Sequence, residues 1–203
     1  MATPEGYARN PELVINFYNE RRKQLLDVVP NAGHLGVADL ERDFNVTVVT
    51  QNVDNLHERA GSTHVIHLHG ELTKVCSSRD PYNPHFVKEL APEEYEVKLG
   101  DKAGDGTQLR PFIVWFGESV PEIETAIRYV EQADIFVIIG TSLNVYPAAG
   151  LLNYVPRAAE VYLIDPKPVD THVMRPIHVI QKGASEGVKE LKALLTVTQP
   201  PLP

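Results

Sequence analysis

The sequence has almost no cysteine, no long apolar run and fewer basic than acidic residues. Cys76 is the single cysteine among 203 residues, which excludes an internal disulfide and a zinc site built from paired thiolates. The longest apolar runs, such as IFVIIG at 135–140, are far shorter than the roughly 20 residues that span a membrane. The net charge of -8 leaves no evident basic face for nucleic acid. We therefore expect a cytoplasmic protein that binds neither nucleic acid nor membrane.

Short apolar segments alternate with segments of helical periodicity along most of the chain. The segments predicted to be strands are 45–50, 65–68, 112–116, 134–140, 161–165 and 178–181. The predicted helices are 11–27, 31–43, 54–60, 121–133, 147–155 and 185–195. Wholly apolar strands that alternate with helices favour a parallel sheet covered on both faces. The sequence thus predicts an α/β protein with a doubly wound, Rossmann-like sheet.

The segment 77–110 departs from this alternation because it is rich in Asp, Pro, Gly, Lys and Glu. We expect it to be a small lobe inserted into a single domain that spans 1–203. Its glycines at 100–106 follow no apolar strand and are surrounded by acidic residues. A solvated turn is therefore favoured there over a phosphate loop.

Three polar loops follow predicted strands, and ligands of open α/β sheets bind at strand carboxyl ends. The loops are TQNVDNLH at 50–57, HGEL at 69–72 and GTSLNVYPAAG at 140–150. Amides and a carboxylate suit sugar hydroxyls, and Gly-Thr-Ser at a helix start suits an anion. Each loop alone is commonly a cap or a turn. The three together favour a nucleotide site.

The stretch HVIHLHGEL, residues 64–72, holds three histidines within six positions. In a strand His67 and His69 would share one face, so a metal pair is conceivable there. No third ligand is evident nearby, and we therefore expect no metal. Because His69 stands at a strand end before a glycine, it is the better placed of the three to act as a base.

Four motifs occur in the order and approximate spacing of the sirtuins, which are NAD-dependent protein-lysine deacylases. They are TQNVDNLHERAG, HLHGEL, RPFIVWFGE and GTSLNVYPAAG, and the likeness runs from about residue 3 to 195. The front of the chain, ATPEGYARNPELVINFYNERRKQL, resembles bacterial members grouped with the class III desuccinylases. The resemblance implies removal of acyl groups from protein lysines with NAD, giving nicotinamide and O-acyl-ADP-ribose.

The resemblance also assigns roles to individual residues. His69 would be the general base, and Gln51, Asn52, Val53 and Asp54 would contact the nicotinamide and its ribose. The phosphates and the adenosine end of NAD would be bound by a second set, which comprises Gly140, Thr141, Ser142, Asp165 and Ala184.

Two further groups are implied to bind the acylated lysine. The segment VWFGES, with Val114, Phe116, Gly117 and Glu118, resembles the strand that pairs with the substrate backbone, although its apolar residues could equally be core. Tyr18 and Arg21 lie three residues apart on a helix, and together they can bind an acyl carboxylate. The Tyr-x-x-Arg pattern matches the family members that recognise succinyl and malonyl groups. An exposed arginine beside a half-buried tyrosine is the plainer alternative.

The chain departs from the family pattern in three places. The paired zinc cysteines of many sirtuins are absent, so we expect no zinc. Asp165 stands where many relatives have asparagine near the adenosine. The family's opening strand and its Gly-Ala-Gly-x-Ser loop would precede Met1, which suggests a truncated or mis-started chain.

These departures leave other functions open. A sirtuin-like remnant could bind acyl-lysine or a nucleotide without turnover, and a protein ADP-ribosyltransferase would use the same cofactor chemistry. An unrelated dehydrogenase is least supported, because no glycine-rich dinucleotide fingerprint follows any predicted strand.

Overall fold

A computed structural model of the chain describes residues 2–141, 148–168 and 175–198, and the chain divides into two compact units. Unit 1 consists of Met1–Val29, Val49–Asn55 and His67–Glu122. Unit 2 consists of Pro30–Val48, Leu56–Ile66 and Ile123–Pro203. Within the described residues, no helix has the length and apolar character needed to cross a membrane.

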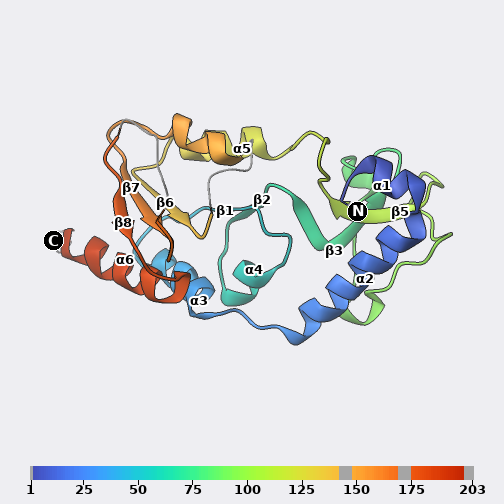
Figure 1. Cartoon of the computed structure of the whole chain (residues 1–203), viewed down its shortest axis with the longest axis horizontal. Helices are drawn as coiled ribbons and strands as arrows, with labels where there is room; N and C mark the ends of the chain where they lie inside the picture. The colour runs from blue at the N-terminus through green and yellow to red at the C-terminus, as the bar shows by residue number, and fades with distance from the viewer. Residues whose placement is uncertain (1, 142–147, 169–174, 199–203) are drawn as a thin grey trace. The chain divides into compact units, whose positions relative to one another are not determined.

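Two capped helices open unit 1. The first, α1 (Pro4–Arg9), begins where the Thr3 hydroxyl accepts a hydrogen bond from a backbone N–H of the first turn. The second, α2 (Pro11–Asp27), begins after Asn10, whose side chain caps the N-terminus in the same way, and its bounds confirm the prediction of 11–27. One face of α2 is buried, and the helix contacts both β3 (Gly70–Ser77) and β5 (Leu109–Ile113) (Figure 1).

Unit 1 contains an antiparallel sheet in the order β4-β3-β5, with β4 at Lys88–Glu89 and short 3-10 turns at Pro84–Phe86 and Pro92–Glu94. Strand β3 was not predicted, because its polar and apolar residues do not form a continuous apolar run. The predicted strand at 112–116 was wrong by three residues, since β5 ends at Ile113. The close approach at Gly70 explains part of this pairing: its φ is 81°, and a Cβ there would lie 2.1 Å from the Phe112 carbonyl oxygen.

Unit 2 contains a parallel sheet in the order β6-β7-β8. Its strands are β6 (Ile135–Ile139), β7 (Glu160–Ile164) and β8 (His178–Ile180). The helices of this unit are α3 (Ala32–Asp39), α4 (Leu56–Ala60), α5 (Ile123–Val130) and α6 (Ala184–Thr198), with 3-10 turns at Leu40–Arg42 and Ala148–Tyr154. The parallel strands and their helices agree with the predicted α/β class, whereas the helices expected at 31–43, 121–133 and 147–155 are shorter or partly 3-10.

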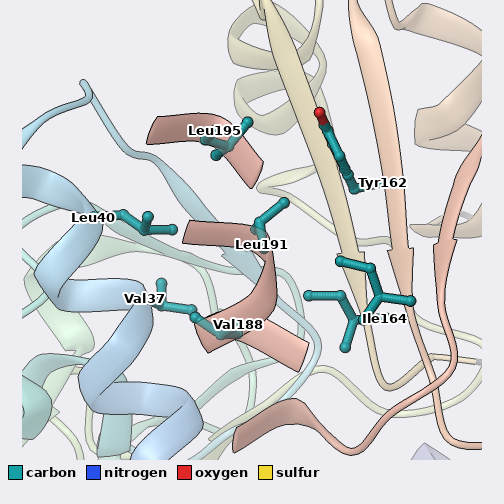
Figure 2. Close-up of a cluster of buried hydrophobic side chains, with 8 residues drawn as sticks. Val37, Leu40, Tyr162, Ile164, Val188, Leu191 and Leu195 are labelled. Atoms are coloured by element: carbon teal, nitrogen blue, oxygen red, sulfur yellow. The ribbon is translucent and has the colours of Figure 1, made fainter. Parts of the chain in front are cut away.

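Aliphatic side chains from α3, α6 and the sheet form one cluster in unit 2 (Figure 2). The cluster includes Val37 of α3, Leu40 of the following 3-10 turn, Val188 and Leu191 of α6, and Ile164 of β7. Helix α3 packs on α6. Gly36 permits this contact, because a Cβ at that position would lie 2.8 Å from a methyl group of Val188. The core of unit 2 is therefore almost wholly apolar.

The remaining strands, β1 (Val48–Thr50) and β2 (Val65–His67), form a two-stranded sheet. The division between the two units passes through both strands. The polar loop that follows β1 and the glycine-containing loop that follows β2 both belong to unit 1.

Candidate active site

His69 lies between β2 and β3, and its ring orientation is set by the backbone. The Nδ1 atom of His69 lies 3.2 Å from the carbonyl oxygen of Gln51. Because a carbonyl oxygen only accepts hydrogen bonds, Nδ1 carries the hydrogen and the neutral ring keeps its lone pair on Nε2. No other described residue forms a hydrogen bond with the ring. The half-buried His69 can therefore accept a proton at Nε2.

The loop after β1 is held by three consecutive carbonyl groups. Besides the Gln51 carbonyl, that of Asn52 lies 3.1 Å from Nδ1 of His67, and that of Val53 accepts from the backbone N–H of Leu72 at 2.7 Å. These bonds turn the backbone toward the scaffold and fix its conformation. The exposed Asn52 and the half-buried Gln51 and Asp54 provide amide and carboxylate groups at this loop.

Arg22 connects helix α2 to Leu72 of β3, the residue whose N–H bonds to the loop after β1. Its Nε donates to the carbonyl of Leu72 at 2.8 Å, and Nη1 donates to Asn19 and to the carbonyl of Tyr95. Burial lowers the pKa of Arg22 to about 10, so the guanidinium remains charged at neutral pH. Arg22 could not be predicted from the sequence, because an arginine on a helix with many polar residues is usually exposed.

Two of the three histidines that open the run 64–69 serve as scaffold in the structure. His67 is 8% exposed and bonds to the Asn52 carbonyl. In unit 2, His64 lies 3.3 Å from the Thr47 hydroxyl and packs edge-on against Tyr129. Within the described ranges, no group of three or more His, Cys, Asp and Glu residues could hold a metal ion.

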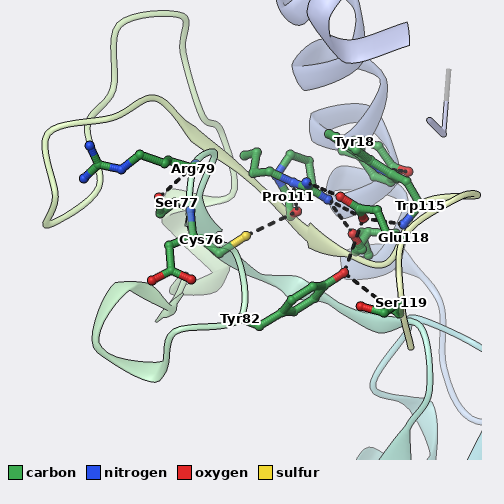
Figure 3. A network of polar contacts seen from close by, with 12 residues as sticks. Tyr18, Cys76, Ser77, Arg79, Tyr82, Pro111, Trp115, Glu118 and Ser119 are labelled. Atoms are coloured by element: carbon green, nitrogen blue, oxygen red, sulfur yellow. Dashed lines mark hydrogen bonds and ion pairs between the residues drawn. The ribbon is translucent and has the colours of Figure 1, made fainter. Parts of the chain in front are cut away.

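Cys76 is a buried thiol. Its Sγ donates to the carbonyl of Pro111 at 3.7 Å, and burial raises its pKa to about 12 (Figure 3). Beside it, the Ser77 hydroxyl donates to Asp105 at 2.7 Å and lies 3.0 Å from the Thr107 hydroxyl. Hydrogen bonds from Thr107 and then Ser77 lower the pKa of Asp105 to about 2. A carboxylate-centred hydrogen-bond network thus joins the end of β3 to the segment before β5.

Tyr18 and Arg21 differ in burial although they are only three residues apart. Tyr18 is 6% exposed, and its phenolic oxygen accepts from Nε1 of Trp115 at 3.1 Å (Figure 3). Burial raises the pKa of Tyr18, while Trp115 and the charges of Arg110 and Arg21 act in the opposite direction. Arg21 is exposed, and its guanidinium lies 5.3 Å from the centre of the Phe17 ring. A buried phenol and an exposed cation therefore stand near each other on α2.

The segment 114–118 leaves β5 and turns. The N–H of Val114 donates to the His69 carbonyl at 2.9 Å, which joins this segment to the histidine loop, and the N–H of Phe116 donates to the Ala2 carbonyl. Among the described residues, no donor reaches the carbonyl oxygens of Val114 and Phe116. Phe116 is 73% exposed, and Gly117 has a φ of 91°. The carbonyl oxygens of Val114 and Phe116 can therefore accept hydrogen bonds from a ligand.

Glu118 is the partner of a buried arginine. Arg110, which is 3% exposed, donates to both oxygens of Glu118 at 2.7 and 3.0 Å and to the carbonyl of Ile113. Although burial raises the pKa of Glu118, hydrogen bonds from Arg110 and the Trp115 N–H hold it below its usual value. Neither Arg110 nor Trp115 was predicted to belong to the site. Trp115, the only tryptophan, lies inside the motif RPFIVWFGE, and this position could have indicated its importance.

The second predicted set of cofactor-binding residues lies in unit 2, at the carboxyl ends of its parallel strands. Gly140 follows β6 with a φ of 59°, and its N–H donates to the last carbonyl of β7. Asp165 follows β7, Ala184 begins α6, and the half-buried Thr141 follows Gly140. Ser142 lies outside the described residues. The structure thus places Gly140 and Asp165 at the ends of the neighbouring strands β6 and β7.

Comparison with known proteins identifies similar chains. Residues 1–147 match the model of the Sir2 family. An NAD-dependent protein deacylase of Bacteroides thetaiotaomicron is 83% identical over 195 residues, which cover 96% of this chain and 83% of the relative. A crystal structure of a Sir2 homologue in complex with NAD matches with a TM-score of 0.81 and 36% identity, over 97% of this chain and 76% of the other. A Sir2 structure with a p53 peptide and NAD matches with a TM-score of 0.76 and 27% identity, over 96% and 82%.

Proposed function

The chain belongs to the Sir2 family and is an NAD-dependent protein deacylase, and we propose that it removes succinyl and malonyl as well as acetyl groups from protein lysines. The products would be the free lysine, nicotinamide and O-acyl-ADP-ribose. We propose that it acts in the cytoplasm and without a structural zinc.

The orientation of His69 is the observation that carries the catalytic part of this proposal. Its Nδ1 hydrogen is directed to the Gln51 carbonyl, so Nε2 is left to accept a proton. The same bond joins the base to the loop of Gln51, Asn52, Val53 and Asp54. The side chains of Gln51, Asn52 and Asp54 suit ribose hydroxyls and a carboxamide. The base and the proposed ribose-binding groups lie on separate segments of the chain, and this hydrogen bond holds the two segments together.

The hydrogen-bonding groups of His69 and of the loop after β1 are of the kinds that would bind a nicotinamide dinucleotide. When bound, NAD supplies the ribose carbon that receives the acyl oxygen and the nicotinamide that leaves it. Nε2 of His69 would accept the proton that a ribose hydroxyl of NAD loses. In unit 2, the strand-end residues Gly140, Thr141 and Asp165, with Ala184 at the start of α6, would bind the phosphates and the adenosine ribose.

The edge formed by Val114, Phe116, Gly117 and Glu118 would bind the peptide. Its unbonded carbonyls can accept backbone or side-chain N–H groups of an extended substrate. Glu118 would act indirectly, because its carboxylate is engaged by Arg110. The exposed Phe116 ring offers apolar surface for the lysine stem.

The preference for acidic acyl groups is supported by Tyr18 and Arg21. A phenol donor and a guanidinium on one helix can together bind a carboxylate. An acetyl group has no carboxylate, so it gains nothing from the pair.

The specificity is tested with Arg21→Met. We expect succinyl-peptide turnover to fall by about 10- to 100-fold, as for the loss of a charge-assisted hydrogen bond, while acetyl-peptide turnover changes little. Lys23→Met is the matched control, because it removes an exposed cation from the same helix. Equal losses on both peptides would refute the acidic-acyl preference and leave the deacylase function intact.

A further inference from the structure

Trp115 and Tyr18 share a hydrogen bond whose direction is fixed by chemistry. Indole Nε1 can only donate, whereas a phenolic oxygen can both accept and donate. The 3.1 Å contact therefore uses a lone pair of Tyr18 and leaves its O–H hydrogen available. No described residue accepts that hydrogen, although Tyr18 is only 6% exposed. A buried donor without an acceptor costs stability unless a ligand completes it.

Trp115 is held tightly enough to direct this bond. It is 2% exposed, and the guanidinium of Arg110 lies 3.5 Å from the centre of a Trp115 ring. Its backbone N–H donates to Glu118 at 2.8 Å, and the Tyr7 ring packs beside it with centroids 5.2 Å apart. Figure 3 shows the network of Tyr18, Trp115 and Glu118 with the contacts that join them. The indole therefore has a fixed position from which to hold the phenol.

We infer that Trp115 is a positioning residue for acyl selection: its indole N–H occupies the acceptor side of Tyr18 and thereby presents the Tyr18 hydrogen to an acyl carboxylate. This inference rests on the proposed preference for acidic acyl groups. A phenol that accepts one hydrogen bond is also polarised into a stronger donor in the next. The carboxylate would receive this hydrogen while Arg21 supplies the opposite charge.

A purely structural role for Trp115 makes a different prediction. Loss of packing would weaken the binding of every acyl peptide to a similar degree. Loss of the Tyr18 orientation would instead lower the ratio of succinyl-peptide to acetyl-peptide affinity, because only the succinyl group has a carboxylate to receive the hydrogen.

The test is calorimetric titration of the full chain with succinyl-lysine and acetyl-lysine peptides of one sequence. Trp115→Phe keeps an aromatic ring but removes the donor, and we expect the affinity ratio to fall about tenfold, the scale of one hydrogen bond to a charged group. In a Tyr18→Phe background, Trp115→Phe should lower the ratio no further. Tyr7→Phe is the matched control, since it removes a hydroxyl beside the indole without touching the Tyr18 bond, and the ratio should stay unchanged.

A second readout uses the fact that Trp115 is the only tryptophan. The single indole N–H resonance should shift more with succinyl-lysine peptide than with acetyl-lysine peptide, and Arg21→Met should abolish that difference. If the unaltered chain binds both peptides equally, the acidic-acyl proposal fails and the inference fails with it. The inference alone is overturned if the unaltered chain discriminates between the peptides but Trp115→Phe leaves the affinity ratio unchanged. It is also overturned if the indole resonance shifts equally with both peptides.

Discussion

The two units of the molecule differ in the number of polar and charged side chains that they bury. Seven polar or charged residues are buried in the described part of the chain, and all but Ser62 lie in unit 1. Unit 1 buries charged groups such as Arg22 and Arg110 beside an apolar cluster of Ile15, Val75 and Val97. The core of unit 2 is a cluster of apolar side chains such as Leu191.

This difference follows what each unit has to do. The proposed base, the loop after β1 and the acyl-binding pair all lie in unit 1, where backbone carbonyls and side-chain hydroxyls must point in set directions. Directional hydrogen bonds can impose such orientations, and apolar packing cannot. Unit 2 presents strand ends, and an apolar core suffices to keep a parallel sheet and its helices together.

The largest effect is expected from Arg110→Met in unit 1. It leaves the Glu118 carboxylate buried without its cation, which costs about 4 kcal/mol of unfolding free energy. Urea unfolding followed by Trp115 fluorescence measures it. The double variant Arg110→Met with Glu118→Leu should recover part of the loss, because the remaining buried charge is gone. An unchanged urea midpoint in the single variant would show that the ion pair does not organise unit 1.

Leu191→Ala tests the apolar core of unit 2. Leu191 is fully buried, so truncation should cost about 3 kcal/mol through lost burial and the cavity left behind. Leu194→Ala on the same helix is the matched control, since that residue is 43% exposed and should cost well under about 1 kcal/mol. Hydrogen exchange of α6 amides reports the change. Similar costs at both positions would contradict an aliphatic core.

The contribution of the helix N-caps to the unfolding free energy should be about the same in the two units. Asn10 caps α2 in unit 1 and Asn31 caps α3 in unit 2, each through its side-chain oxygen. Asn10→Ala and Asn31→Ala should each cost about 1 kcal/mol. Chemical denaturation of the two variants measures the effect. A large cost in one unit only would mean that the cap there also serves the core.

The smallest effect is expected for the loss of stability at low pH, and we attribute part of that loss to Asp105 of unit 1. Its folded pKa of about 2 lies below the ordinary value of 3.8, so its contribution to stability is complete above pH 3.8 and is lost as the pH falls toward 2. Glu118, whose pKa is also lowered, adds a loss of the same sign. Tm values measured across the range from pH 5 to 2 should fall less steeply for Asp105→Asn than for the unaltered chain. Parallel curves would exclude Asp105 as a source of acid sensitivity.

The fold of unit 2 could be predicted well because its strands are mostly apolar. The runs at 134–140 and 161–165 contain β6 and most of β7. In unit 1, the helix at 11–27 was identified from its cap and proline. Strand β3 could not be found in this way. Its residues are partly polar because Ser77 enters the hydrogen-bond network with Asp105, which is 28 residues away along the chain.

The candidate site also has features that could be predicted from the sequence and features that could not. The positions of the loop residues and of His69 next to strands could be predicted, because these residues follow apolar runs and match family motifs. The bonds that orient them could not, because Arg22 reaches the Leu72 carbonyl 50 residues away and Trp115 reaches Tyr18 97 residues away. Such contacts between distant residues have no local periodicity in the sequence.

The most direct test of the account is mass-spectrometric detection of nicotinamide and O-acyl-ADP-ribose formed from NAD and a succinyl-lysine peptide. The unaltered chain should form both, His69→Ala should reduce the rate by about 10²- to 10⁴-fold, and the exposed His85→Ala should have no effect. Binding of NAD and peptide without nicotinamide release, or undiminished turnover by His69→Ala, would contradict the assignment of His69 as the base of a deacylase.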